Sequence, residues 1–256
     1  MLVRELFDLS GRIALVTGGS RGLGLGIATA LGEMGARVAI AARKADELQE
    51  AGAHLAQLGI EAQAIVADLA DLAAIPKLVE QVAERLGDID ILVNNAGTTW
   101  GAPAETHPAD AWHKVMTLNV DATFFLSQEV ARRSMIPRRR GKIINMASIA
   151  GLSGGLGLST VAYNTSKAAI IQCTRTLAAE WGKYNINVNA LCPGFFPSKM
   201  SRGVLERIEP VILARTPLQR LGGEDDLKGA VAFLASEASR HVTGQYVAVD
   251  GGASIA

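Results

Sequence analysis

The feature that most constrains this chain is a regular alternation of short β-branched runs with segments of helical periodicity. Near-continuous apolar runs occur at residues 12–16, 37–42, 62–66, 89–94, 142–146, 187–191 and 246–249. Strands that read as continuous apolar runs are covered on both faces, as in a parallel sheet. Helical periodicity occupies intervening segments such as residues 23–34, 45–58, 75–86 and 168–181. The alternation predicts an α/β fold, with a doubly wound, seven-stranded parallel sheet and helices on both of its faces.

Length and composition indicate a single domain that spans residues 1–256. The chain has 49% apolar residues and a net charge of zero, from 25 basic and 25 acidic side chains, which excludes the disordered class. No linker-like shift in composition divides the chain. Because the charges balance, the composition provides no field for binding nucleic acid or an anionic membrane.

No targeting segment or membrane span is apparent in the sequence. The first residues, MLVRELFDLSGRIALVTGG, lack a basic region followed by a long apolar stretch, so they are interpreted as the start of the fold rather than a signal peptide. No apolar window reaches the length of about 18 residues that a membrane helix requires. Cys173 and Cys192 form no disulfide framework, and the histidines show no metal-ligand spacing. We expect a cytoplasmic protein with no metal, no nucleic-acid partner and no membrane partner.

Two segments interrupt the alternation. Residues 151–160 (GLSGGLGLST) contain four glycines, which predicts a loop. Residues 193–223 contain prolines at 193, 197, 210 and 217, which predicts a loop and broken helices rather than one continuous helix. We expect this second segment to cover the carboxyl edge of the sheet, where ligands bind in such folds, and we name it the lid segment. Its apolar side chains are Phe195, Phe196, Met200, Val204, Leu205, Ile208, Val211, Ile212 and Leu213.

A glycine-rich turn, TGGSRGLG over residues 17–24, joins the first predicted strand to the first predicted helix. Gly18, Gly22 and Gly24 allow the backbone to turn tightly and to approach a pyrophosphate held at the helix N-terminus. The spacing, Gly-x3-Gly-x-Gly, differs from the GxGxxG pattern of the general dinucleotide-binding fold. Its position between a strand and a helix favours a nucleotide site over a simple turn.

The end of the second predicted strand bears on the choice of nucleotide. An NAD site places a carboxylate there to accept a hydrogen bond from the ribose 2′-hydroxyl. This chain instead continues AARK over residues 41–44, with no acidic residue before Asp46. The Arg43 guanidinium can pair with a 2′-phosphate, supported by Arg21 of the turn; the alternative is that both are solvated surface charges. The pattern favours NADP over NAD.

A tyrosine and a lysine are four residues apart in the segment AYNTSKAAI. On a helix, Tyr163 and Lys167 point to the same face. A tyrosine with its reference pKa of about 10 is a poor acid–base group at neutral pH, and a shift to about 7 requires about 4 kcal/mol of preferential phenolate stabilisation. An adjacent ammonium and the positive charge of an oxidised nicotinamide can supply it. A single YxxxK pair also arises by chance on amphipathic surfaces.

Together these motifs resemble those of the short-chain dehydrogenase/reductase family over essentially the whole chain. They follow one another at successive strand ends. They comprise residues 17–24, Asp68, residues 94–97 (NNAG), Asn119, Ser148, Tyr163 with Lys167, Pro193 with Gly194, and residues 250–252 (DGG). The resemblance implies a Rossmann-type fold, oxidoreductase activity and a homotetramer. The short segments NNAGTTWGAPAE and PGFFPSKM are similar to bacterial 3-oxoacyl reductases and to gluconate 5-dehydrogenase-like members.

The resemblance also implies roles for matching residues. Ser148 would hold the substrate carbonyl, and Tyr163 would donate its proton. Lys167 would bind the nicotinamide ribose and lower the tyrosine pKa, while Asn119 would anchor a water in the proton relay. The implied cofactor-binding set is Gly18, Ser20, Arg21, Gly22, Leu23, Gly24, Arg43, Asp68, Leu69, Asn95, Ala96, Gly97, Tyr163, Lys167, Pro193, Gly194, Phe196 and Ser198. Ser148 and Tyr163 lie 15 residues apart, which is longer than is common in the family, and the glycine-rich loop can absorb the excess.

The sequence thus predicts an NADPH-dependent carbonyl reductase that transfers hydride to a ketone carbon while a tyrosine protonates the oxygen. A 3-oxoacyl thioester is the leading substrate; keto-sugar acids such as 5-ketogluconate, and cyclic ketones, are alternatives. A cofactor-binding protein without turnover is a further alternative, but it would not need a general acid. A basic cluster precedes the fifth predicted strand and is interpreted as a solvated helix end, with contact to an acidic carrier protein or a CoA phosphate as the alternative. Its members are Arg132, Arg133, Arg138, Arg139, Arg140 and Lys142.

Overall fold

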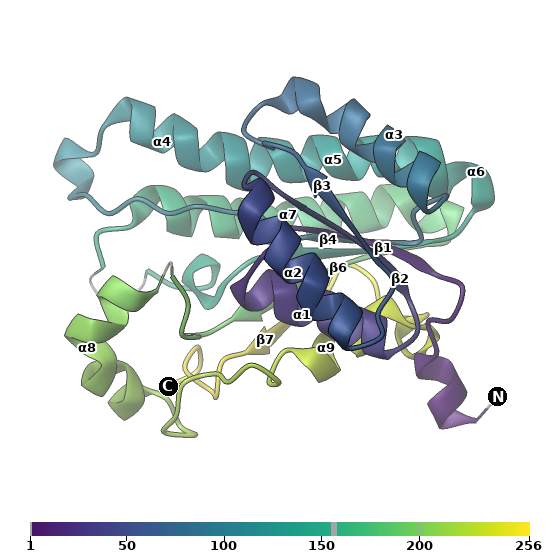
Figure 1. Cartoon of the computed structure of the whole chain (residues 1–256). Helices are drawn as coiled ribbons and strands as arrows, with labels where there is room; N and C mark the ends of the chain where they lie inside the picture. Colours follow the sequence, from purple (N-terminus) through teal and green to yellow (C-terminus); the bar gives the residue numbers. More distant parts are fainter. Residues whose placement is uncertain (1, 155–157, 200) are drawn as a thin grey trace.

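In the computed structural model, which describes residues 2–154, 158–199 and 201–256, the chain forms one seven-stranded sheet (Figure 1). The strands are β1 (Ile13–Thr17), β2 (Arg37–Ala42), β3 (Ala62–Val66), β4 (Ile91–Asn94), β5 (Gly141–Met146), β6 (Ile186–Pro193) and β7 (Tyr246–Val249). Their order is β3-β2-β1-β4-β5-β6-β7, and all neighbouring pairs are parallel. The predicted doubly wound α/β fold is confirmed.

Helices cover both faces of this sheet (Figure 1). They are α1 (Gly22–Glu33), α2 (Ala45–Gln57), α3 (Ile75–Arg85), α4 (Ala109–Met116), α5 (Ala122–Val130), α6 (Ile136–Arg138), α7 (Val161–Trp181), α8 (Arg202–Arg215) and α9 (Lys228–Ala235). One face packs against α1, α2 and α9, and the other against α3, α5 and α7. Successive residues of a strand point to opposite faces of the sheet. Val16 of β1 is therefore buried with residues of α1, α2 and α9, and Leu15 with residues of α3, α5 and α7.

The strand order reverses between β1 and β4, and this reversal positions the functional site. From β1 the chain proceeds outward through β2 and β3, and then returns to place β4 on the other side of β1. Every residue of β1, β4 and β5 is buried, whereas the edge strands β3 and β7 are partly exposed. At such a reversal the loops that follow the two strands separate, which opens a crevice at their carboxyl ends.

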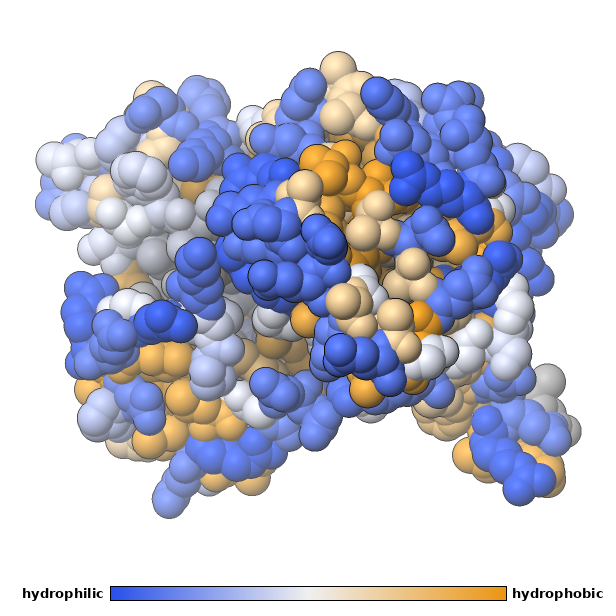
Figure 2. Space-filling view, in the orientation of Figure 1, coloured by the Kyte–Doolittle hydropathy of each residue, from blue (hydrophilic) through white to orange (hydrophobic). Residues whose placement is uncertain are grey.

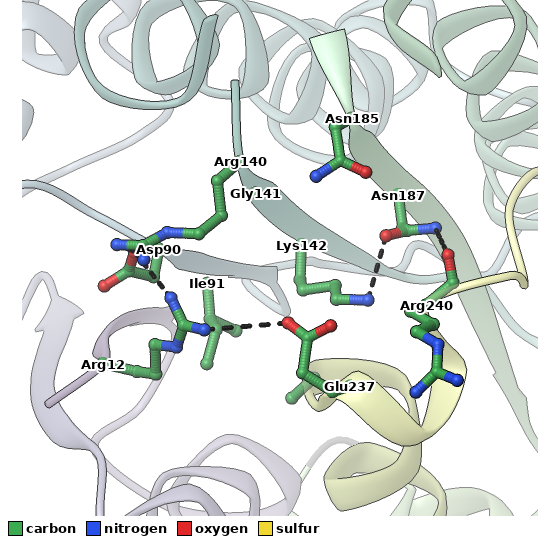
Figure 3. Close-up of a pocket in the computed structure, with 11 residues that line it drawn as sticks. Arg12, Asp90, Ile91, Arg140, Gly141, Lys142, Asn185, Asn187, Glu237 and Arg240 are labelled. Carbon is green, nitrogen blue, oxygen red and sulfur yellow. Dashed lines mark hydrogen bonds and ion pairs between the residues drawn. The ribbon is translucent and has the colours of Figure 1, made fainter. Parts of the chain in front are cut away.

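At the opposite, amino edge of the sheet, the carboxylate of buried Asp90 holds two members of the chain's basic cluster, Arg138 and Arg140. Its oxygens accept hydrogen bonds from Arg138 Nη1 at 3.0 Å, from Arg140 Nη2 at 2.7 Å and from the backbone N–H of Ile13 at 3.1 Å. Figure 3 shows Asp90 together with Arg140 and Arg12. The cluster was predicted to be a solvated helix end and loop; Arg138 and Arg140 are in addition ion-paired with Asp90, while 46% of the Arg140 side chain is exposed to solvent. A carrier protein bound here would lie at the wrong edge of the sheet to deliver a substrate to the crevice.

The lid segment differs from its prediction in one respect. It contains one continuous helix, α8, with Pro210 inside it, rather than broken helices. Proline removes the hydrogen bond that would reach the carbonyl of Glu206, but Glu206 and Pro210 are both exposed, so water can satisfy that carbonyl.

In the predicted loop at residues 151–160, a 3₁₀ turn ends at Gly151. Residues 152–154 and 158–160 form no further helix or strand, and residues 155–157 lie outside the described part of the chain.

Within the described ranges, no helix combines the length and apolar character needed to cross a membrane. The same residues contain no group of three His, Cys, Asp or Glu side chains placed to hold a metal ion. Both cysteines are free thiols, and burial raises the pKa of Cys192 to about 11.

Candidate active site

A cavity of about 860 Å³ opens at the carboxyl edge of the sheet. It is lined by the segments that follow β1, β2, β3, β4, β5 and β6, together with the first turns of α7 and the lid segment. Its volume lies in the upper part of the range for ligand pockets, about 300–1,000 Å³. Every residue of the predicted cofactor-binding set lines it. Of the predicted catalytic residues, Tyr163 and Lys167 line the cavity; Ser148 lies between the lining residues Ala147 and Ile149, and neither it nor Asn119 is itself a lining residue.

The glycine-rich turn at the base of the cavity is held by the strand beside it. Asn95, directly after β4, donates from Nδ2 to the carbonyl oxygens of Thr17 and Gly18, at 2.8 and 3.2 Å. In return, the Thr17 hydroxyl accepts the backbone N–H groups of Asn95 and Ala96, both at 3.0 Å. Gly18 has φ +63°, which favours glycine. A Cβ on Gly24 would lie 2.5 Å from Asn95 Nδ2 and would overlap the Gly18 carbonyl, so this turn has no room for a side chain.

At the far end of the cavity, beyond β2, cationic side chains surround one carboxylate. Glu47, in the first turn of α2, forms ion pairs with Arg21 and with Lys44 Nζ at 3.1 Å. Ser20 Oγ lies 3.4 Å from the same carboxylate. Arg43 lines the cavity and has no ion pair with any residue that the structure describes. The sequence indicated Arg21 and Arg43 but not Glu47. A glutamate three residues after a lysine is common on the surface of any helix, so this spacing does not indicate a binding site.

The side chains of Ser148 and Tyr163 meet at the end of β5 despite their long separation in sequence. Ser148 hydrogen-bonds to Tyr163, and its hydroxyl also accepts the backbone N–H of Ala150 at 3.1 Å. Two features position them: the 3₁₀ turn that follows Ser148 and the first turn of α7, where Tyr163 lies. Gly151 permits the turn to contact α7, since a Cβ there would lie 2.6 Å from the carbonyl carbon of Lys167.

Lys167 is buried one helical turn after Tyr163. Its Nζ donates to the carbonyl oxygen of Met146 at 2.6 Å and lies 5.6 Å from the centroid of the Tyr163 ring. Burial lowers the pKa of Lys167 to about 8, since desolvation disfavours its charged form. Burial also raises the pKa of Tyr163, and the hydrogen bond from Ser148 opposes this rise. In the protein without cofactor, the pKa of Tyr163 is thus raised, whereas the sequence predicted that a lysine and an oxidised nicotinamide would lower it.

Asn119 lies in a π-helical turn (Thr117–Asp121) between α4 and α5, and both polar atoms of its side-chain amide form hydrogen bonds. Nδ2 donates to the Thr98 carbonyl and to Ser166 Oγ, both at 2.9 Å, and Oδ1 accepts the Thr98 N–H at 2.8 Å. A Cβ on Gly97 would lie 3.2 Å from Asn119 Oδ1 and 3.7 Å from Lys167 Nζ. Gly97 thus lies against both of these polar atoms.

The wall after β6 depends on the chain's C-terminal motif. Gly194 packs against Asp250, since a Cβ on it would lie 2.8 Å from the Asp250 Cα. The Asp250 carboxylate accepts the backbone N–H groups of Gly252 and Ser254, at 3.0 and 2.8 Å, which fixes the turn after β7. Phe196 is buried in the core that includes β1, α1 and α9 while also lining the cavity.

The lid segment presents a more polar surface to the cavity than its composition predicts. Of its apolar side chains, Phe195, Phe196 and Ile212 line the cavity, and Val211 is exposed. Met200 and the side chain of Val204 lie outside the described part of the structure. The polar residues of this segment that line the cavity are Ser198, Lys199, Ser201, Arg215 and Thr216. Figure 2 shows hydrophobic residues on the surface around α8, where Val211 is exposed.

Comparisons with known proteins place this site among related enzymes. The family model described as "Enoyl-(Acyl carrier protein) reductase" matches residues 18–254. The chain is 42% identical to the rhamnolipids biosynthesis 3-oxoacyl-[acyl-carrier-protein] reductase of Pseudomonas aeruginosa, covering 96% of this chain and 97% of that protein. It is 39% identical to the gluconate 5-dehydrogenase of Gluconobacter oxydans, covering 98% of both. The crystal structure of a gluconate 5-dehydrogenase from Burkholderia cenocepacia, in complex with NADP and tartrate, matches with a TM-score of 0.94, 37% identity and full coverage of both chains.

The close approach at Gly24 can be tested by a pair of alanine substitutions in α1. Gly24→Ala should lower the free energy of unfolding by about 1–3 kcal/mol, because the new methyl group overpacks the turn. Gly26→Ala is the matched control: its Cβ would lie 3.7 Å from the Glu224 carbonyl oxygen, so alanine should stabilise the helix by about 0.5–1 kcal/mol. Urea denaturation measures both changes. Equal effects of the two substitutions would contradict the described geometry of the turn.

Proposed function

Because this chain belongs to the short-chain dehydrogenase/reductase family, we propose that it is an NADP(H)-dependent oxidoreductase that interconverts a ketone and a secondary alcohol. One observation carries the proposal: Tyr163, bonded to Ser148 and one turn from the ammonium of Lys167, lines the same cavity as the glycine-rich turn. A protein that only bound the nucleotide would need the turn but no general acid. The alternative of binding without turnover is therefore less favoured.

The residues present fit a dinucleotide at the base of the cavity. The absence of side chains at Gly18 and Gly24 allows the turn to pack directly against Asn95. The N-terminus of α1, whose first N–H groups have no partner within the helix, lines the cavity at residues 22–24 and suits a pyrophosphate. Asp68 and Leu69 line the cavity after β3, beside the end of β2. When bound, the nicotinamide supplies the hydride. We propose that the predicted cofactor-binding residues hold it through these contacts.

The chain's own residues can manage the proton. In our proposal Ser148 holds the substrate oxygen, and the hydroxyl of Tyr163 donates its proton to that oxygen. A raised pKa keeps this hydroxyl protonated at neutral pH, which is the form that ketone reduction requires. Lys167 then returns a proton to Tyr163, through a water beside Gly97, which lies against both Lys167 and Asn119. Asn119 acts as a positioning residue, because its side chain holds Thr98 and Ser166 in place.

We propose NADP(H) rather than NAD(H) as the cofactor. Arg21, Arg43 and Lys44 line the far end of the cavity, where a 2′-phosphate would need cationic partners. Glu47 neutralises part of this charge, while Arg43 has no ion pair among the described residues. The Burkholderia cenocepacia relative, with full coverage, was crystallised with NADP.

For the substrate, we propose a 3-oxoacyl thioester first. Apolar side chains from three different segments line the cavity in addition to Tyr163: Ile149, Leu158, Phe195 and Ile212. The relative with 42% identity carries the corresponding name. The second candidate is a keto-sugar acid, favoured by the polar face of the lid segment and in particular by the Arg215 guanidinium, which can pair with a carboxylate.

We also propose a homotetramer located in the cytoplasm. Large apolar side chains are exposed on α5 (Phe125, 42%) and on the edge strand β7 (Tyr246, 41%), and a neighbouring copy can cover them. An edge strand in particular offers unpaired backbone groups to a second sheet.

Removing the tyrosine hydroxyl tests the proposed general acid. Tyr163→Phe should reduce NADPH-dependent ketone reduction by about 10²–10⁴-fold, because the proton donor is lost while the ring still packs. Binding of NADPH, followed by its fluorescence, should persist. Tyr246→Phe removes the same atom outside the cavity and should leave turnover unchanged. Activity of Tyr163→Phe above a tenth of the wild-type value would contradict the assignment.

A charge reversal beside β2 tests the cofactor. Arg43→Asp should shift the ratio of kcat/KM for NADPH over NADH toward NADH, since it removes a partner of the 2′-phosphate and adds an acceptor for a 2′-hydroxyl. Arg4→Asp, in the exposed N-terminal turn, changes the net charge equally and serves as the control. An unchanged ratio in Arg43→Asp would show that Arg43 is a surface charge.

A substrate series distinguishes the two candidate substrates. If the apolar side chains contact the acyl chain, each added methylene contributes about 0.8 kcal/mol, so kcat/KM for 3-oxoacyl thioesters should rise about fourfold per methylene over the first few carbons. Efficient reduction of 5-ketogluconate, together with a flat thioester series, would instead support the keto-sugar acid.

A further inference from the structure

A second, smaller pocket lies at the amino edge of the sheet, away from the active-site cavity. It has a volume of about 40 Å³ and lies between the starts of β4, β5 and β6 and the turn that follows α9. Figure 3 shows that Lys142 of β5 and Glu237 extend toward one another across it. Neither residue has a part in the reaction proposed above.

Lys142 is a buried amine with few interactions that stabilise its positive charge. Its residue is 8% exposed, and its Nζ donates to Asn187 Oδ1 at 2.9 Å. Asn187 is fixed in turn, because its Nδ2 donates to the carbonyl oxygens of Arg240 and Val242 at 3.2 and 3.1 Å. An ammonium carries three hydrogens, and within the described ranges Nζ of Lys142 has no other hydrogen bond and no ion pair. Burial accordingly lowers the pKa of Lys142 to about 8, with Arg12 lowering it further and Glu237 opposing.

The charged groups around this amine have both signs. Arg12, Arg140 and Arg240 line the pocket, together with the carboxylates of Asp90 and Glu237. Buried Asp90 pairs with Arg140 at 2.7 Å and with Arg12 at 3.8 Å, and Arg12 also pairs with the partly exposed Glu237 at 3.7 Å. Among the described residues Arg240 has no ion pair, so the pocket offers one unpaired guanidinium group for an anion and, in Glu237, a carboxylate that can accept a proton.

We propose that Lys142 is an acylation site for small acyl phosphates, with Glu237 as the proton acceptor and Arg240 as the phosphate-binding group. The free amine attacks the acyl carbon, a C–N bond forms, and the C–O bond to the phosphate breaks, so that inorganic phosphate leaves with the bonding electron pair. The proton released from Nζ passes to Glu237 and then to solvent. No oxidant or other co-reactant is required.

The product is compatible with the pocket. An amide N–H can still donate to Asn187 Oδ1, and the pocket volume admits an acyl group of acetyl size rather than a long chain. Acylation removes one positive charge from the amino edge. Because this edge is opposite the active-site cavity, ketone reduction should be unaffected.

The test is treatment of the full-length protein with acetyl phosphate at pH 7.5, followed by peptide mass spectrometry over time. With a pKa of about 8, about a quarter of Lys142 is the free amine at this pH, against about one in a thousand for an ordinary lysine. Nucleophilicity falls as pKa falls, as it does for thiols, so we expect Lys142 to be acetylated about tenfold faster than the exposed Lys77 and Lys183. Its rate should level off above pH 8, while the rates at the two reference lysines continue to rise.

Two variants and a second donor complete the test. Glu237→Gln and Arg240→Gln should each slow acetylation at Lys142 severalfold without changing the rates at Lys77 and Lys183, and their melting curves verify that they are folded. A neutral acetyl thioester should show a smaller preference for Lys142 than acetyl phosphate does, because it has no phosphate for Arg240 to bind. Acetylation of Lys142 no faster than at the reference lysines, an equal preference with the neutral donor, or unchanged rates in both variants would overturn the proposal.

Discussion

The active-site cavity depends on the hydrogen bonds that join the ends of β1 and β4. Thr17 and Asn95 exchange side-chain and backbone hydrogen bonds across the point where the strand order reverses. These bonds fix the glycine-rich turn so closely that Gly24 has no space for a methyl group. They also fix the segment after β4, which places Gly97 beside Asn119 and Lys167. One contact thus fixes both the glycine-rich turn at the base of the cavity and the segment that brings Gly97 beside Asn119 and Lys167.

The two buried lysines illustrate how the same physical effect acts in different surroundings. Burial lowers the pKa of both Lys167 and Lys142 to about 8. Lys167 donates to a backbone carbonyl and lines the large cavity beside Tyr163, which suits the role in proton transfer that we propose for it. Lys142 donates to an asparagine and lines a small pocket with a carboxylate and arginines, which suits an amine nucleophile. The neighbouring groups, rather than the pKa, distinguish the two roles.

Charge arrangement was the property least accessible from the sequence. The run of arginines before β5 suggests a basic surface, yet Asp90, about 50 residues earlier, holds two of them at the amino edge. At the far end of the active-site cavity, the sequence indicates Arg21 and Arg43 but gives no reason to single out Glu47, which pairs with Arg21. Ion pairs between distant segments depend on which loops meet in space, and no local pattern encodes them.

The sequence by itself determined the order and type of the elements, because the alternation of apolar runs with helical periods permits only a parallel, doubly wound sheet. It also located the segments that line the active-site cavity, since carboxyl ends of parallel strands meet at one edge. Only the tertiary structure decided which side chains face the cavity. The apolar composition of the lid segment did not reveal that Val211 is exposed while Arg215 lines the cavity, because one helix can direct its residues to either side. Pro210 likewise lies inside a continuous helix, since the carbonyl that it leaves unpaired faces water, and exposure is a property of the packed fold.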